Sequence, residues 1–132
     1  MTGETDLARL LAGMRPALDD ELWVFCVVPG GGPPDGALDP VATVREDEGW
    51  TAVIPRGRAE AAGLRYDGAF RRITLTVHSS LSAVGLLAAV TRALAERGIA
   101  CNAVSGAYHD HLFVPVGRAD DALTVLSALG TP

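Results

Sequence analysis

The alternation of hydrophobic and polar residues along the chain predicts short strands. Between Arg72 and His78, apolar residues at 73, 75 and 77 alternate with polar ones, a period of two typical of a strand with one buried face. The segment Leu22 to Val28 is apolar throughout, so we expect a strand in mid-sheet with both faces covered. Apolar runs between turn residues give the full set of expected strands: 22–28, 41–45, 50–54, 72–78, 99–105 and 111–115.

Apolar residues at helical spacing predict four helices, over residues 6–14, 58–62, 82–97 and 118–129. In the third, Ser82 is expected to cap the start and Gly98 to end the helix in a left-handed conformation. Its apolar side would carry Val84, Leu87, Thr91 and Leu94. The segment 29–40, rich in glycine and proline, is expected to be a loop, and residues 46–49 a hairpin turn.

A six-residue pattern occurs twice, sixty positions apart. Pro55-Arg56-Gly57-Arg58-Ala59-Glu60 returns as Pro115-Val116-Gly117-Arg118-Ala119-Asp120, each time after an apolar strand. Both copies are typical of a strand that ends at a proline and turns into a helix, which indicates one unit folded twice.

The order of elements predicts the fold class. The second half is expected to run strand, helix, strand, strand, helix, which is a ferredoxin-like βαββαβ unit without its closing strand. In the first half the loop 29–40 stands where the long helix should be, and the strand near Arg72 could serve both units. We therefore predict an α+β protein of tandem ferredoxin-like units, residues 1–68 and 69–132, with an antiparallel sheet and helices on one face.

Composition and charge narrow the function. The net charge is −5 with Lys+Arg at 11, and no basic cluster is longer than Arg71-Arg72, which speaks against a nucleic-acid binder. No apolar run approaches the roughly 20 residues that span a bilayer, so we expect no membrane partner. The start lacks the basic segment of a secretory signal, and the expected location is cytoplasmic. Cys26 and Cys101 sit in apolar runs, where free thiols are expected rather than a disulfide.

Three segments carry a resemblance to a known family. They are 74–87 (TLTVHSSLSAVGLL), 98–104 (GIACNAV) and 104–115 (VSGAYHDHLFVP). Together they resemble the ACT domain family of small-molecule-sensing modules, and more closely the stand-alone bacterial tandem ACT-like proteins. The resemblance implies that the turn after the first strand and the start of the following helix bind an effector, often an amino acid, and that the chain forms a homodimer.

The residues expected to bind the effector surround that turn. A helix start offers free N–H groups and a favourable dipole to an anion such as a carboxylate, and Gly85 lets a ligand approach the backbone. Asn102, in an otherwise apolar strand, would be a buried amide that bonds either a ligand or a neighbouring loop. The expected ligand-binding set is His78, Ser79, Ser80, Val84, Gly85, Leu86 and Asn102. In the alternative interpretation the serines only cap the helix and Gly85 only permits packing.

A second polar cluster comprises His109, Asp110 and His111. Imidazoles two apart on a strand point the same way and, with His78, could ligate zinc, but a closed zinc site needs about four ligands and no fourth is evident. The alternative is a polar turn in which Asp110 bonds backbone or fixes a histidine tautomer. We predict no metal and no cofactor.

Catalysis has little support in the sequence. His78 and Ser79 are neighbours, and adjacent residues on a strand face apart, so no activated nucleophile is implied. The expected function is a non-catalytic regulatory module that binds a small molecule, an amino acid by resemblance. Two alternatives remain: a structural or oligomerisation protein without a ligand, and a histidine-based metal-dependent enzyme.

Overall fold

The computed structural model describes residues 2–130 and divides into two compact units. One, here the terminal unit, combines Met1–Asp20 with Arg71–Pro132; the other, here the inserted unit, is Glu21–Phe70. The terminal unit contains α1 (Leu7–Gly13), β1 (Pro16–Leu18), most of β5 (Phe70–Leu75), α3 (Leu86–Glu96), β6 (Asn102–Ser105), β7 (Asp110–Pro115), the 3-10 helix η2 (Val116–Arg118) and α4 (Ala119–Leu129). The inserted unit contains β2 (Trp23–Val28), the 3-10 helix η1 (Gly36–Leu38), β3 (Ala42–Glu46), β4 (Gly49–Pro55) and α2 (Arg56–Ala61).

In the terminal unit the strands lie in the order β1-β5-β7-β6. β1 pairs antiparallel with β5, with Pro16 opposite Leu75 and Leu18 opposite Ile73. The N-terminal segment therefore supplies the closing strand that the second half of the sequence lacks. Proline is tolerated in β1 because the strand is short and lies at the edge of this sheet.

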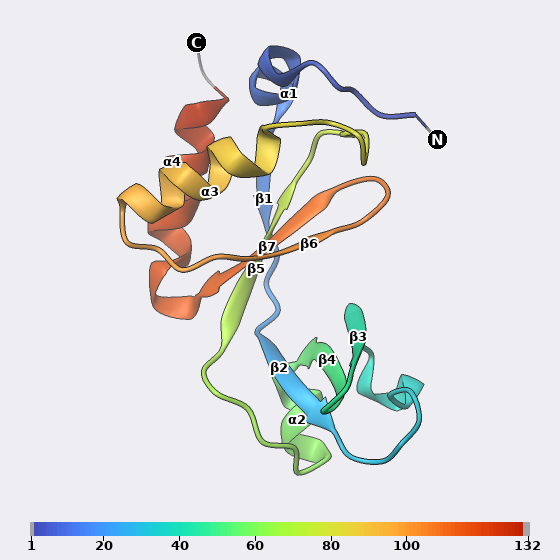
Figure 1. Cartoon of the computed structure of the whole chain (residues 1–132). Helices are drawn as coiled ribbons and strands as arrows, with labels where there is room; N and C mark the ends of the chain where they lie inside the picture. Colours follow the sequence, from blue (N-terminus) through green and yellow to red (C-terminus); the bar gives the residue numbers. More distant parts are fainter. Residues whose placement is uncertain (1, 131–132) are drawn as a thin grey trace. The chain divides into compact units, whose positions relative to one another are not determined.

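The core of the terminal unit lies between this sheet and its helices. Figure 1 shows α3 and α4 together on one side of the strands, as the sequence predicts. Ile73 and Leu75 are fully buried while Thr74 between them is only partly buried, which confirms the alternation within β5, although the strand ends at Leu75 and not at residue 78 as predicted. The helices contribute their buried residues at helical spacing: Leu10 and Met14 beside α1, Leu86, Val90 and Leu94 in α3, and Ala119, Ala122 and Leu126 in α4.

Helix α3 begins four residues later than predicted. Its N-cap is Gly85 with φ of 107°, and no side chain caps it, so the expected Ser82 cap is wrong. Val84 precedes the helix and is 83% exposed, so it does not belong to the buried side. The chain leaves β5 at Leu75 and needs a ten-residue loop, 76–85, before the positive φ of Gly85 turns it into the helix.

In the inserted unit the strand order is β3-β4-β2, with a hairpin between β3 and β4 as predicted. β2 is paired on both sides, along its length with β4 and at Trp23 with Phe70, so its expected place in mid-sheet is confirmed. Its faces are not both covered, because Val27 is 64% exposed. The short η1, capped by Asp35, occupies the loop that replaces a long helix.

The repeated sequence folds the same way in both units. Pro55 ends β4 and Pro115 ends β7, with φ of −58° and −55°, and a helical segment follows each. Ala59 and Ala119 are both buried, at 0% and 3% exposure. Strand, proline and helix thus recur as one unit folded twice, as the sequence predicts.

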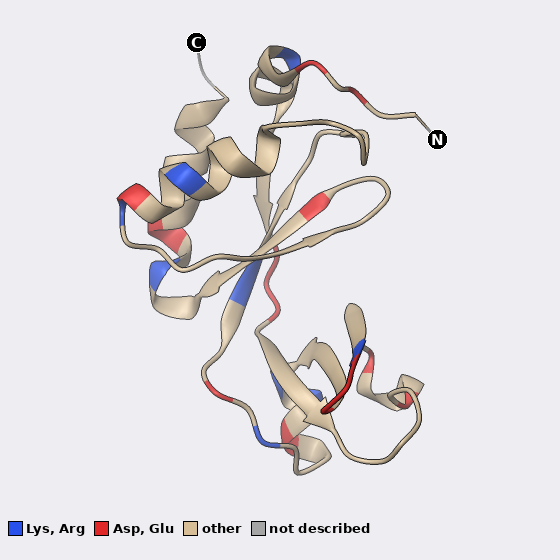
Figure 2. Cartoon of the chain, viewed as in Figure 1, with Lys and Arg blue, Asp and Glu red and all other residues tan. Residues whose placement is uncertain are grey.

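The basic pair at the start of β5 is engaged within the terminal unit. Arg72 Nε lies 2.7 Å from Asp19 Oδ2, and Arg71 donates to the Asp19 carbonyl at 2.6 Å. Figure 2 shows this pair as the blue segment of β5. Over residues 2–130, none of the helices has the length and apolar character needed to cross a bilayer.

Candidate functional site

The loop 76–85 is a tightly bonded turn that leads from β5 into α3. Ser79 N–H donates to the Val77 carbonyl at 3.0 Å, and Ala83 N–H to the Ser80 carbonyl at 3.0 Å. Ser80 Oγ accepts from Ser82 N–H at 3.0 Å. Ser80 therefore stabilises the turn itself, six residues ahead of the first residue of α3, rather than capping the helix.

The N-terminus of α3 is open. The first N–H groups of any helix lack an intrahelical partner, and here Gly85 offers no side chain to accept from them. The N–H of Ala89 is the first that bonds back, to the Gly85 carbonyl at 2.9 Å. Within the described residues 2–130, no side chain caps α3 and the N–H groups of Leu86, Leu87 and Ala88 have no acceptor inside the helix, so they are available to a ligand, and the helix dipole adds positive potential.

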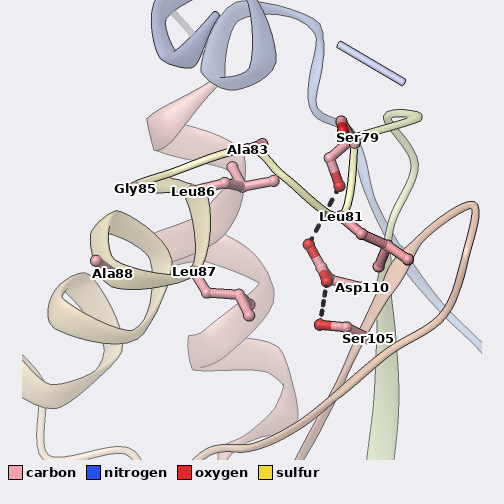
Figure 3. Close-up of a pocket in the computed structure, with 10 residues that line it drawn as sticks. Ser79, Leu81, Ala83, Gly85, Leu86, Leu87, Ala88, Ser105 and Asp110 are labelled. Carbon is pink, nitrogen blue, oxygen red and sulfur yellow. Dashed lines mark hydrogen bonds between the residues drawn. The ribbon is translucent and has the colours of Figure 1, made fainter. Parts of the chain in front are cut away.

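The residues that carry these groups, Leu86, Leu87 and Ala88, line a cavity of about 180 Å³. Its walls come from the loop 76–85, the first turn of α3 and the β6–β7 hairpin, all in the terminal unit (Figure 3). The lining residues are Ser79, Ser80, Leu81, Ala83, Gly85, Leu86, Leu87, Ala88, Ser105 and Asp110.

Asp110 is the one charged residue of the lining, and it is only 7% exposed. Ser105 Oγ donates to Asp110 Oδ1 at 2.6 Å, whereas Ser79 Oγ lies 3.5 Å from Oδ2, at the limit of a hydrogen bond. Figure 3 shows the carboxylate between the two serines. No ion pair joins Asp110 to a residue in the described range 2–130. A buried carboxylate normally has a cationic partner or several donors, so Oδ2 has capacity for another donor.

The structure brings together part of the expected ligand-binding set. Ser79, Ser80, Gly85 and Leu86 line the cavity, and Asp110 joins them from the second polar cluster. Five further lining residues lie outside the expected ligand-binding set: Leu81, Ala83, Leu87, Ala88 and Ser105. Ser105 reaches the cavity because it pairs with Asp110 in the register of β6 and β7, and no short pattern of residue types indicates that register.

Three expected residues lie outside the lining. The carbonyl of His78 accepts from Glu4 N–H at 2.9 Å, and its ring packs against Tyr108 with centroids 5.2 Å apart. Within residues 2–130, the buried Nε2 of His78 has no hydrogen-bond partner. Val84 is exposed, as described above. Asn102 is also exposed, on the edge strand β6, so the expectation of a buried amide is wrong.

The histidines of the second cluster form a different arrangement. The rings of His109 and His111 lie 6.5 Å apart, and His111 Nδ1 is 3.0 Å from Thr74 Oγ1. Burial lowers the pKa of His111 below its ordinary 6.5, and the charges of Arg72 and His109 act in the same direction. Among the residues that the structure describes, no three His, Cys, Asp or Glu side chains are grouped so as to hold a metal ion.

Comparison with known proteins defines the family. A family model of the ACT domain matches residues 2–71, and a second ACT domain model matches residues 70–128. The chain therefore belongs to the ACT domain family and carries two ACT domains in tandem. The expected boundary between residues 68 and 69 stays a prediction. No curated protein shows a significant match.

Solved structures extend the likeness over nearly the whole chain. A protein of unknown function from Vibrio cholerae, described as a possible transport protein, shares 45% identity over 95% of this chain and 96% of its own, with a TM-score of 0.86. The regulatory subunits of aspartate kinase from Thermus flavus and Thermus thermophilus, the latter in a ligand-free form, give TM-scores of 0.67 and 0.68 at 13% identity. They match 89% and 92% of this chain, and 97% and 99% of their own chains. At that identity the likeness concerns the fold, which is that of tandem ferredoxin-like units.

Proposed function

We propose that this protein is a non-catalytic regulatory module that binds an amino acid in the cavity of the terminal unit. Membership of the ACT domain family supports a regulatory, ligand-binding role. The choice of an amino acid rests on the cavity. We propose further that the protein is located in the cytoplasm and catalyses no reaction.

The observation that carries the proposal is the pair of opposite polar features in one small cavity. The open N-terminus of α3 suits a carboxylate, since the N–H groups of Leu86 to Ala88 have no intrahelical acceptor. The buried Asp110 carboxylate suits a cation that can donate hydrogen bonds. An α-amino acid carries both groups on one carbon, so its carboxylate would lie at α3 and its ammonium at Asp110.

The lining of the cavity favours an apolar side chain on the ligand. Leu81, Ala83 and Leu87 form the apolar part of the lining and would surround that side chain. We therefore propose an amino acid with an apolar side chain.

Exposed apolar residues favour a second candidate function, self-association. Leu81, Val84 and Tyr108 are 73%, 83% and 59% exposed, and the first two belong to the loop beside the cavity. Large apolar side chains gathered on a surface are typical of interaction sites. A homodimer through this surface predicts that Val84→Asp shifts the protein to a monomer in light scattering, and an unchanged mass would contradict it.

The test of the first candidate is a thermal-shift screen of the full chain against the twenty L-amino acids, each at millimolar concentration. A ligand at 100 times its dissociation constant stabilises the folded state by about 2.7 kcal/mol, which raises the melting temperature by several degrees. Two matched controls separate the polar contacts: the amide of the best amino acid lacks the carboxylate, and the corresponding 2-hydroxy acid lacks the ammonium. Both should stabilise far less, and no response to any amino acid would contradict the proposal.

A further inference from the structure

The N-terminal segment Gly3–Leu7, here the N-terminal strap, lies directly along the loop 76–85. Glu4 forms a parallel bridge with Ser79. Glu4 N–H donates to the His78 carbonyl at 2.9 Å, and Ser80 N–H donates to the Glu4 carbonyl at 2.9 Å. In Figure 1 this segment is the blue coil ahead of α1. These bonds and the bridge join the strap to His78, Ser79 and Ser80, and of these Ser79 and Ser80 also line the cavity.

Gly3 makes this approach possible. A Cβ atom at Gly3 would lie 2.4 Å from Ser80 N, 2.5 Å from the Ser79 carbonyl carbon and 2.8 Å from the Ser79 carbonyl oxygen. These are backbone atoms and cannot rotate away, so only glycine fits against the loop in this position.

The other end of the strap reaches the start of α3. Leu7, the first residue of α1, packs over Gly85, where a Cβ would lie 3.1 Å from Leu7 Cδ2. The strap leads into a helix that is fixed in the core. Leu10 and Met14 are fully buried and anchor α1, and Asp6 caps the helix by accepting from Arg9 N–H. The strap therefore contacts the loop at two points, at Ser79–Ser80 in the middle and at Gly85 at the end that leads into α3.

We propose that the N-terminal strap regulates the amino-acid site by holding the loop 76–85 in its binding conformation. This inference rests on the function proposed above. The strap contributes no group to the cavity, yet its backbone bonds fix Ser79 and Ser80, and its Leu7 side chain fixes Gly85. Release of the strap frees the loop and lowers affinity for the amino acid. By linkage, an occupied cavity holds the strap more tightly to the same extent.

The experiment compares the full-length wild type with Gly3→Ala, which forces the strap off the loop without changing a cavity residue. The control is Gly13→Ala, which adds the same methyl group at the end of α1, where it meets only Val77 Cγ2 at an ordinary 3.8 Å. Leu7→Ala is a second test variant, since it removes the contact with Gly85 and Leu7 is 37% exposed. The probe is an equimolar mixture of the twenty L-amino acids, with melting temperature and amide hydrogen exchange as readouts.

We expect the mixture to slow exchange at the amides of Glu4 and Ser80 in the wild type and in Gly13→Ala. In Gly3→Ala these amides exchange rapidly with or without the mixture. The concentration of the mixture that gives half of the full rise in melting temperature increases at least tenfold in Gly3→Ala. In Leu7→Ala this concentration also increases. If Gly3→Ala and Leu7→Ala both bind within twofold of the wild type, the strap has no regulatory role and the amino-acid site stands. If the mixture changes neither the melting temperature nor the hydrogen exchange of the wild type, both the proposed amino-acid site and the regulatory role of the strap are contradicted.

Discussion

Ser105 and Asp110 form the end pair of the β6–β7 ladder, and the Ser105 hydroxyl donates to Asp110 Oδ1 at 2.6 Å. The hairpin, rather than the loop 76–85, therefore positions the carboxylate. The cavity has two separately built halves: a fixed acid on the hairpin and an open helix N-terminus reached through a loop.

Replacement of Asp110 by asparagine should weaken amino-acid binding selectively. A hydrogen bond to a charged group contributes about 1.5–3 kcal/mol, so affinity should fall by roughly 10- to 100-fold. The corresponding 2-hydroxy acid, which lacks the ammonium, should bind the variant as well as it binds the wild type. The control is Asp120→Asn, at the exposed start of α4. It should leave the dissociation constant of the amino acid, measured by titration calorimetry, unchanged.

Replacement of Gly85 by alanine should destabilise the fold as well as the site. Its φ of 107° is strained for any residue with a Cβ, and the methyl group would meet Leu7 Cδ2 at 3.1 Å. A strained backbone position of this kind costs of order 1–3 kcal/mol, measurable by urea unfolding. Gly117→Ala has neither a positive φ nor an atom within 4 Å of the new methyl, so it should stay within about 0.5 kcal/mol of wild type. Equal stability of both variants would contradict the geometry assigned to Gly85.

The stability of the protein should depend on the protonation of His111. Burial and the neighbouring Arg72 and His109 lower the pKa of His111, while Asp110 and Asp19 raise it by less. Because the unfolded chain then takes up a proton before the folded one, this contribution to stability is present above pH 6.5 and is lost as the pH falls toward the lower folded pKa.

His111→Gln keeps a polar group near Thr74 and removes the titration. The free energy of unfolding should therefore decline less steeply below pH 6.5 in this variant than in the wild type. His109→Gln removes the charge of the neighbouring ring, which lowers the pKa of His111, but keeps burial as the main cause, so the decline should lessen by a smaller amount than in His111→Gln. The same slope in His111→Gln and the wild type would show that this ring does not titrate as described.

The repeated arginines should have matched roles in their own units. Arg118 donates to the Arg97 and Gly98 carbonyls at 3.0 and 3.5 Å, at the end of α3, and Arg58 donates to the Ala37 carbonyl at 3.3 Å, in η1. Loss of these bonds in Arg118→Ala should cost about 1 kcal/mol in stability. Hydrogen exchange should rise near Arg97 in Arg118→Ala and near Ala37 in Arg58→Ala, and the reverse pattern would contradict equivalent roles.

Much of the fold follows from local patterns in the sequence. The alternation before His78 and the doubled proline-to-helix pattern predict strands and helices that recur in the structure. The closing strand β1 was not predictable in this way, because three residues beginning with Pro16 carry no periodic signal. Its strand conformation comes from pairing with β5, a contact between residues almost sixty positions apart.

The candidate site was predictable only in part, for the same reason. The sequence predicts a helix N-terminus after the strand near His78, but it places the start at Ser82 instead of Leu86 and so misses the uncapped N-terminus. The approach of Ser105 and Asp110 depends on the register of the hairpin, and the outward direction of Asn102 depends on β6 being an edge strand. Neither the register nor the strand order is encoded in a short pattern of residue types.

The most direct test of the account is a titration of isotopically labelled protein with the best-stabilising amino acid, followed by amide chemical shifts. We expect the largest changes at Leu86, Leu87 and Ala88, where the carboxylate would bind, and at Ser105 and Asp110, where the ammonium would bind. Large shifts confined to the inserted unit, or none at saturation of the thermal response, would contradict it.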